Sequence, residues 1–301
     1  MLQIGESLTR ALESGASPVA LESTIFSNLG LPSPANREAL DRCNAAIRQA
    51  GAEPALTAVL HGSSVVGVES EHYATICGPA RKVAERDLSV AMAQAWPYGA
   101  TTVSASLALA AAAGVEVFAT GGLGGVHRGV EESLDVSADL KALATHRAIT
   151  VSSGAKVFLD LARTLEVLET LSVPVLGFGC DDFPAFYARS SGLPVPHRVD
   201  SAEQVASIAR HHWSLGGAGI LVVNPVPEAS AIDSSVLDSA VKGALDSAAR
   251  SGVTGAAVTP LVLAEIAALT NGQSVPTNLA LAESNAAVAA EIAVALRAAQ
   301  R

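Results

Sequence analysis

Short runs rich in valine, isoleucine and leucine recur along the chain and are separated by longer segments of helical pattern. The runs lie at residues 19–21, 55–60, 115–120, 148–152, 173–178 and 220–224. None alternates cleanly between apolar and polar residues, which indicates strands covered on both faces. Helices are expected at residues 36–50, 85–95, 103–113, 156–170, 202–215, 236–250, 260–270 and 275–299. This order predicts an α/β fold with a largely parallel sheet.

The composition is that of a folded chain with a well-buried core. Half of the 301 residues are hydrophobic and 16% are charged, which excludes a disordered chain. We see no internal repeat and no low-complexity linker, so residues 1–301 are expected to form a single domain. Residues 181–196 are dense in proline, glycine and serine, but they also carry Phe183, Phe186 and Tyr187. They are therefore expected to form an ordered loop, which in many proteins is functional.

Charge and cysteine usage exclude several classes of protein. The net charge is −10, so nothing draws the whole chain towards nucleic acid or an anionic membrane. Three scattered cysteines do not suit a disulfide scaffold or a zinc site. The longest uncharged window, residues 88–115, is interrupted at Pro97, and neither half reaches the ~20 apolar residues of a membrane helix. The N-terminus does not resemble a signal peptide, and we expect a cytoplasmic protein.

A glycine-rich stretch, TGGLGGVHRG at residues 120–129, follows one of the predicted strands. Open α/β sheets bind ligands at the carboxyl ends of their strands. Glycines let backbone N–H groups approach an anion, and His127 and Arg128 add cationic donors. The stretch has neither the Lys-Ser/Thr of a P-loop nor the G-x-G-x-x-G spacing. It is either an anion-binding loop or a tight connection between a strand and a helix.

Two carboxylates follow this stretch, Asp135 and Asp139. Four residues apart, they would share one face of a helix, or Asp135 would cap the helix that holds Asp139. Oxygen ligands of this kind suit Mg²⁺ or Mn²⁺ beside a phosphate loop. The alternative, a capping residue and a solvated acid, is favoured by the pattern alone.

Lysine is rare here: of 19 basic residues only four are lysines, and Lys156 is the most informative of them. Unlike arginine, lysine can lose its proton and act as a nucleophile. Lys156 is expected to begin a helix, where the macrodipole and apolar neighbours would both lower its pKa. That setting suits a lysine that forms a Schiff base, and the alternative is an exposed lysine that reaches water.

Two further residues are candidates for chemistry. Glu22 ends an apolar strand and is a candidate general acid or base, or else a loop carboxylate. Lys82 is a candidate phosphate anchor, or else a surface charge just before a helix.

These residues lie in stretches that resemble the pseudouridine-5′-phosphate glycosidases, also called the indigoidine synthase A-like family. The most specific are ALEST (20–24), ATGGLGGVHRG (119–129), DVSAD (135–139), GAK (154–156) and TNLAL (277–281). The matching stretches follow one another in order over most of the chain. The resemblance implies a three-layer α/β/α sandwich and a homotrimer.

The resemblance also implies a reaction. Pseudouridine 5′-phosphate and water would give uracil and ribose 5-phosphate, reversibly, with a manganese ion. Glu22 would protonate the ring oxygen, and Lys156 would attack C1′ and hold the opened sugar as an imine. Asp135 matches the metal-binding acid. The substrate-binding positions of the family match Lys82, Val103, His127, Ser137, Ala138, Asp139 and Asn278.

The sequence departs from the family pattern beside Glu22. Residues 27–32 read SNLGLP, with Asn28 in the place of a histidine and one extra residue. Two other functions fit the same residues. One is a Schiff-base aldolase for another sugar phosphate, which needs no uracil pocket. The other is a metabolite-binding module with an unreactive Lys156.

Overall fold

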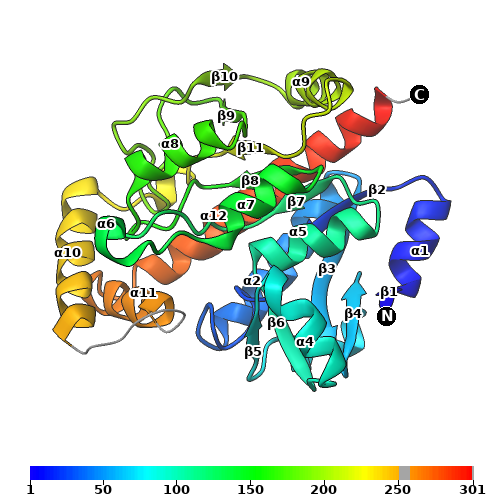
Figure 1. Cartoon of the computed structure of the whole chain (residues 1–301), viewed down its shortest axis with the longest axis horizontal. Coiled ribbons are helices and arrows are strands. Elements are labelled where there is room, and N and C mark those ends of the chain that lie inside the picture. The colour runs from blue at the N-terminus through cyan, green and yellow to red at the C-terminus, as the bar shows by residue number, and fades with distance from the viewer. Residues whose placement is uncertain (251–257, 300–301) are drawn as a thin grey trace.

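The structure, a computed structural model, describes residues 1–250 and 258–299 and is built around one large sheet (Figure 1). The strands of the sheet are β1 (Leu2–Ile4), β2 (Ser17–Leu21), β3 (Ala52–Leu60), β4 (Ser63–Val66), β5 (Arg81–Val83), β6 (Tyr98–Thr101), β7 (Val117–Ala119), β8 (Ile149–Ser152), β9 (Val175–Phe178), β10 (His197–Val199) and β11 (Ile220–Val223). All six predicted strands are confirmed.

The sheet is largely parallel, as the sequence predicts. Its order is β1-β4-β3-β2-β7-β8-β11-β9-β10, and β6 pairs with both β3 and β5. Strand β3 runs antiparallel to β4 and β6, while the central ladder from β2 through β7, β8 and β11 to β9 is parallel throughout. The strands that the sequence did not reveal, β1, β4, β5, β6 and β10, are three or four residues long. Length alone does not explain this, because β7, β8, β9 and β11 are as short. The missed strands are interrupted by polar or charged residues such as Gln3, Arg81 and His197, so they form no apolar run.

Helices cover both faces of the sheet. They are α1 (Glu6–Glu13), α2 (Ala35–Gln49), α3 (Tyr73–Ile76), α4 (Leu88–Ala93), α5 (Val103–Ala112), α6 (Val130–Ser133), α7 (Ala138–Thr145), α8 (Leu161–Thr170), α9 (Ala202–Ser214), α10 (Ser234–Arg250), α11 (Val258–Leu269) and α12 (Ser274–Ala298). Helices α2 and α9 pack on α12, which lies along β2, β7 and β8, whereas α5 and α7 pack together on the opposite face (Figure 1). The three-layer sandwich is confirmed.

Helix α12 is the longest helix described. By length and composition it could cross a membrane, but 56% of its most apolar window is buried inside the fold. Its apolar residues contact the sheet and α2, which is the environment of a core helix. The hydrophobic core accordingly extends from Leu8 in α1 to Leu296 in α12.

One predicted helix begins later than expected. The pattern at residues 156–170 predicts a helix from Lys156, but α8 begins at Leu161, with Asp160 as its N-cap. Residues 156–160 instead pair with the glycine-rich stretch: Lys156 N–H donates to the Leu123 carbonyl and Asp160 N–H to that of Val126, both at 2.9 Å. The expectation that a helix macrodipole acts on Lys156 is therefore wrong.

The loop at residues 181–196 is ordered, as expected. Phe183, Phe186 and Tyr187 are all buried. The ring of Phe186 lies so close to Gly122 that a Cβ atom at that glycine would meet it at 2.5 Å. Phe186 therefore packs this loop against the glycine-rich stretch.

We predict that Phe118→Ala in β7 lowers the free energy of unfolding by about 3–5 kcal/mol, because it leaves a cavity in a fully buried site. Urea denaturation followed by circular dichroism measures this loss. Leu215→Ala, at a side chain that is 88% exposed, is the control and should change stability by less than ~0.5 kcal/mol. Equal losses in the two variants would contradict the described core.

Candidate active site

The carboxyl ends of four neighbouring parallel strands bring the candidate residues to one edge of the sheet. Glu22 follows β2 directly, and Thr120 follows β7. The segment that contains Lys156 follows β8, and Asn224 follows β11. Because β2, β7, β8 and β11 are adjacent, these residues gather at one edge.

Glu22 is a buried acid with an unusual titration. Its side chain is 7% exposed, and its carboxylate accepts a hydrogen bond from the Thr120 hydroxyl. Burial raises the pKa of this carboxyl to about 7, although the positive charge of Lys156 and the Thr120 hydrogen bond lower it. A carboxyl with this pKa can both give and take a proton near neutral pH.

Two lysines share the site with this acid. Lys156 is half-buried, and its Nζ donates to the Gly122 carbonyl at 3.1 Å. Lys82 lies on β5, is exposed, and precedes the helical turn Glu85–Asp87 by three residues. Partial burial lowers the pKa of Lys82, and the positive charge of Lys156 lowers it further. Like charges in one site disfavour each other, which eases the loss of a proton from one of them.

Asp139 joins three segments around this site. It is 6% exposed, and its carboxylate accepts from the backbone N–H of Ser104 at 3.0 Å and of Gly124 at 2.9 Å. The expected arrangement with Asp135 is wrong, because Ser137, not Asp135, caps α7 and accepts from Asp139 N–H. Asp139 thus links the start of α5, where Val103 is buried, with the glycine-rich stretch and with α7.

Asp135 lies beside His127, in the short connection between α6 and α7. Its Oδ2 is 3.9 Å from His127 Nδ1, and the Asp135 side chain is 45% exposed. Among residues 1–250 and 258–299, no group of three histidine, cysteine or acidic side chains could enclose a metal. The donor set fits an ion that is held by one carboxylate, with water and a bound phosphate completing its shell. It does not fit a closed structural metal site.

Asn278 faces the same edge from α12. Its Nδ2 lies 3.2 Å from the hydroxyl of buried Tyr187, whereas its Oδ1 is buried without a partner. This oxygen lies close to Gly121: a Cβ atom added to that glycine would be 3.5 Å from it. A buried acceptor without a partner is costly unless a ligand satisfies it.

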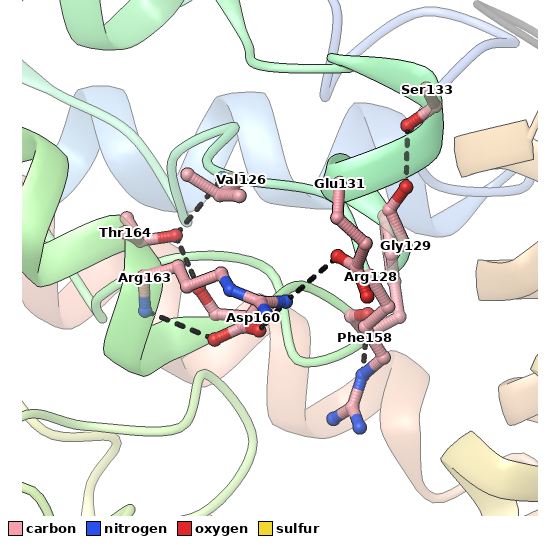
Figure 2. A network of polar contacts seen from close by, with 9 residues as sticks. All are labelled: Val126, Arg128, Gly129, Glu131, Ser133, Phe158, Asp160, Arg163 and Thr164. Carbon is pink, nitrogen blue, oxygen red and sulfur yellow. Dashed lines mark hydrogen bonds and ion pairs between the residues drawn. The ribbon is translucent and has the colours of Figure 1, made fainter.

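The glycine-rich stretch is fastened to the start of α8. Figure 2 shows Thr164 between Val126 and Asp160. Its hydroxyl accepts from Val126 N–H at 3.0 Å and donates to the Asp160 carbonyl at 2.6 Å. Thr164 is fully buried, so both segments are held at a fixed spacing.

An ion-pair network extends this attachment towards α6. Arg163 lies 3.1 Å from both Glu131 and Asp160, and Arg128 Nε donates to the Phe158 carbonyl at 3.2 Å (Figure 2). These contacts bind the two segments that flank His127 and Lys156. The exposed pairs add little stability individually, but they restrict how the segments can separate.

Comparison with known proteins identifies the family. The model of the family described as "Indigoidine synthase A like protein" matches residues 7–295. The chain belongs to the indigoidine synthase A-like family.

Relatives in this family are similar over nearly their whole length. A pseudouridine-5′-phosphate glycosidase of Gemmatimonas aurantiaca is 48% identical over 95% of this chain and 93% of its own. One from Methylobacterium nodulans is 47% identical over 100% of this chain and 89% of its own. A crystal structure of the prealnumycin C-glycosynthase AlnA in complex with ribulose 5-phosphate is 35% identical, with a TM-score of 0.91, over 100% of this chain and 98% of that chain.

The departure from the family pattern beside Glu22 has a structural role. Asn28 Oδ1 accepts from Ala80 N–H at 3.0 Å, and Asn28 N–H donates to the Gly78 carbonyl. Both partners precede Lys82 in the chain. The asparagine therefore ties the loop after Glu22 to the segment that leads into β5.

Four buried polar residues of the site were not singled out from the sequence. Thr120, Ser153, Asn224 and Asn285 are buried and bonded to one another or to the strand ends. Two signals were available. One is a serine directly after the predicted strand 148–152 and an asparagine that ends the predicted strand 220–224, and the other is an asparagine inside an alanine-rich helix. Polar residues in such apolar surroundings usually need a buried partner.

We predict that Glu22 makes stability depend on pH between about 4.5 and 7. Because the pKa is raised in the folded state, the folded protein binds the proton more tightly. This contribution is fully present below pH ~4.5 and is lost as the pH rises through about 7. The difference in unfolding free energy between wild type and Glu22→Gln should therefore change by on the order of 3 kcal/mol across this range.

Urea denaturation at a series of pH values measures the difference. Glu132→Gln, at an exposed acid of α6, is the control and should show no such change. A pH-independent difference for Glu22→Gln would contradict a raised pKa.

Proposed function

We propose that this protein cleaves the carbon–carbon glycosidic bond of pseudouridine 5′-phosphate, reversibly, to give uracil and ribose 5-phosphate. The observation that carries the proposal is a buried acid, Glu22, after β2 and a lysine, Lys156, after β8, at the same edge of the sheet with only β7 between the two strands. The names of the relatives support the substrate. The ribulose 5-phosphate bound to AlnA supports a phosphosugar site.

Opening of the ribose is the first step. A leaving group bonded through carbon does not depart readily from a closed ring. The C1′–O4′ bond of the ring is therefore easier to break than the C1′–C5 bond. The protonated Glu22 gives its proton to that oxygen, and the neutral amine of Lys156 attacks C1′ as the C1′–O4′ bond breaks. A pKa of about 7 keeps much of Glu22 protonated at neutral pH.

Cleavage of the carbon–carbon bond follows. The ionised Glu22 takes a proton from the new secondary ammonium, which restores a lone pair on the Lys156 nitrogen. That lone pair forms a protonated C=N bond to C1′, and the electrons of the C1′–C5 bond pass to the pyrimidine. Proton uptake at C5 gives uracil. Water then hydrolyses the imine, which releases ribose 5-phosphate and returns the free amine. In the reverse direction uracil attacks the same imine.

The phosphate and the base would be held by the residues that the family resemblance points to. Lys82 and the N-terminal N–H groups of α5 and α7, beside Val103, Ser137 and Ala138, suit an anion. His127 can donate to it as well. The partnerless Oδ1 of Asn278 suits an N–H group of a pyrimidine.

A divalent ion, Mn²⁺ or Mg²⁺, would be held by Asp135 and would supply charge that orients the phosphosugar. The single exposed carboxylate beside His127 fits a site of this open kind.

A homotrimer and a cytoplasmic location remain predictions. Analytical ultracentrifugation can test the first of them.

Synthesis of a C-glycoside is the second candidate function. The similarity to AlnA, named a C-glycosynthase, favours it. An acceptor other than uracil would then attack the same imine. Turnover that requires a pyrimidine separates the two functions, and it also excludes a Schiff-base aldolase for another sugar phosphate.

We predict that Lys156→Ala abolishes turnover of pseudouridine 5′-phosphate, by about 10⁴-fold or more, and leaves the fold intact. Reduction with borohydride in the presence of ribose 5-phosphate should attach the sugar phosphate to Lys156, as read by intact mass and peptide mapping. Lys141→Ala, at an exposed lysine of α7, is the matched control and should retain both activity and labelling. An unlabelled Lys156, or labels spread over surface lysines, would refute the Schiff base.

We predict that removal of divalent ions by a chelator lowers activity, and that Mn²⁺ restores it. In Asp135→Asn the Mn²⁺ concentration needed for half-maximal activity should rise by about 100-fold or more, because a neutral amide replaces the charged ligand. The control is Glu132→Gln, at an exposed acid of α6 in the same stretch. An unchanged Mn²⁺ requirement in Asp135→Asn would show that the ion binds elsewhere.

A further inference from the structure

Asn285 lies in α12 directly behind the strand ends that carry the proposed catalytic groups. The side chain is 0% exposed, so it cannot touch a substrate. Its Nδ2 donates to the Thr120 carbonyl at 2.9 Å and to the Gly121 carbonyl at 3.3 Å. Its Oδ1 accepts from Asn224 Nδ2 at 3.0 Å. One amide therefore joins the ends of β7 and β11.

The same amide also reaches the end of β8. Ser153 Oγ lies 3.1 Å from Asn285 Nδ2 and 3.3 Å from its Oδ1, and donates to the Asn224 carbonyl at 2.9 Å. The partners determine how the amide is oriented, because backbone carbonyls only accept and the Asn224 amino group only donates. An aspartate at this position would keep the shape but place charge against carbonyl oxygens.

Each carbonyl that Asn285 holds leads to a proposed catalytic group. Thr120 donates its hydroxyl to the Glu22 carboxylate, so the position of Thr120 sets this hydrogen bond. Gly121 precedes Gly122, whose carbonyl accepts from Lys156 Nζ. Asn285 is thus connected to Glu22 through Thr120. It is connected to Lys156 through Gly121 and Gly122.

We propose that Asn285 is a positioning residue that sets the relation between Glu22 and Lys156 through the Thr120–Gly122 backbone. The proposal rests on the proposed function, in which both groups act on the same sugar. The helix supplies a rigid support, since α12 packs on β2, β7 and β8. Buried hydrogen bonds with all partners present are well suited to hold such a geometry.

The test compares Asn285→Ala and Asn285→Asp with Asn44→Ala. Asn44 is also buried on a helix, and its Nδ2 donates to Tyr73, away from the strand ends. All three variants lose a buried amide and some stability. The aspartate variant retains the side-chain volume, and it serves if the alanine variant does not fold.

We predict that the Asn285 variants lower kcat by about 100-fold and change KM far less, because they misplace the reacting groups while the residues that bind the substrate stay in position. In Asn285→Ala the pKa of Glu22 should also rise above its wild-type value, since the Thr120 hydrogen bond lowers it. Asn44→Ala should change neither quantity. Infrared titration of the buried carboxyl group, assigned by its loss in Glu22→Gln, measures this pKa without substrate.

A double-mutant cycle tests the route through Thr120. In Thr120→Val the carboxylate has already lost its hydrogen bond, so adding Asn285→Ala should shift the pKa of Glu22 no further. An Asn285→Ala protein with wild-type kcat and wild-type Glu22 titration would overturn the proposal. So would equal effects in Asn44→Ala. A wild-type protein inactive on pseudouridine 5′-phosphate refutes the proposed function instead, while the titration still decides the role of Asn285.

Discussion

Parallel pairing of β2, β7, β8 and β11 is the constraint on which the rest of the site depends. The registers set Leu21 opposite Ala119, Ala119 opposite Val151, and Ser152 opposite Val223. The residues that follow these strands therefore emerge side by side, because parallel strands end at the same edge. Segments that are far apart in the chain therefore meet at this edge, and side-chain contacts such as that of Thr120 with Glu22 follow from it.

This edge gathers four charged residues at the border of the core, two of them buried acids. Glu22 and Asp139 are both buried acids, and Lys82 and Lys156 lie near them. Burial of a charge is costly unless it is paired or hydrogen-bonded. The two acids meet this cost differently. Asp139 accepts hydrogen bonds from two backbone N–H groups. Glu22 accepts one hydrogen bond, from the Thr120 hydroxyl, and its pKa is raised. Asp139 is thereby suited to shape the site, and Glu22 to exchange a proton.

The proposed chemistry divides the site into groups that meet the sugar and groups that hold those in place. Glu22 and Lys156 belong to the first kind. Asn285 and Thr164 belong to the second, since both are fully buried and bond to the backbone of the glycine-rich stretch, Asn285 at Thr120 and Thr164 at Val126. The precision that a two-group reaction needs comes from such supports as much as from the reacting groups.

The sequence by itself determined the fold class, because six apolar runs between helical patterns indicate a largely parallel sheet whose strands are covered on both faces. The family resemblance added the three-layer sandwich. It also singled out Glu22 and Lys156, since a strand-end acid and a rare lysine are visible in the chain and in the family motifs. Strands such as β5 and β10 were missed, since charged and polar residues interrupt their apolar pattern.

Tertiary structure alone decided how those residues are used. The stretch after Lys156 has a helical pattern, yet pairing with the glycine-rich stretch delays α8 to Leu161. Four-residue spacing suggested that Asp135 and Asp139 act together, but Ser137 separates them as the cap of α7. Asn285 looked like one polar residue in an alanine-rich helix. Its role depends on partners up to 165 residues away in the chain, and no local pattern records such distant hydrogen bonds.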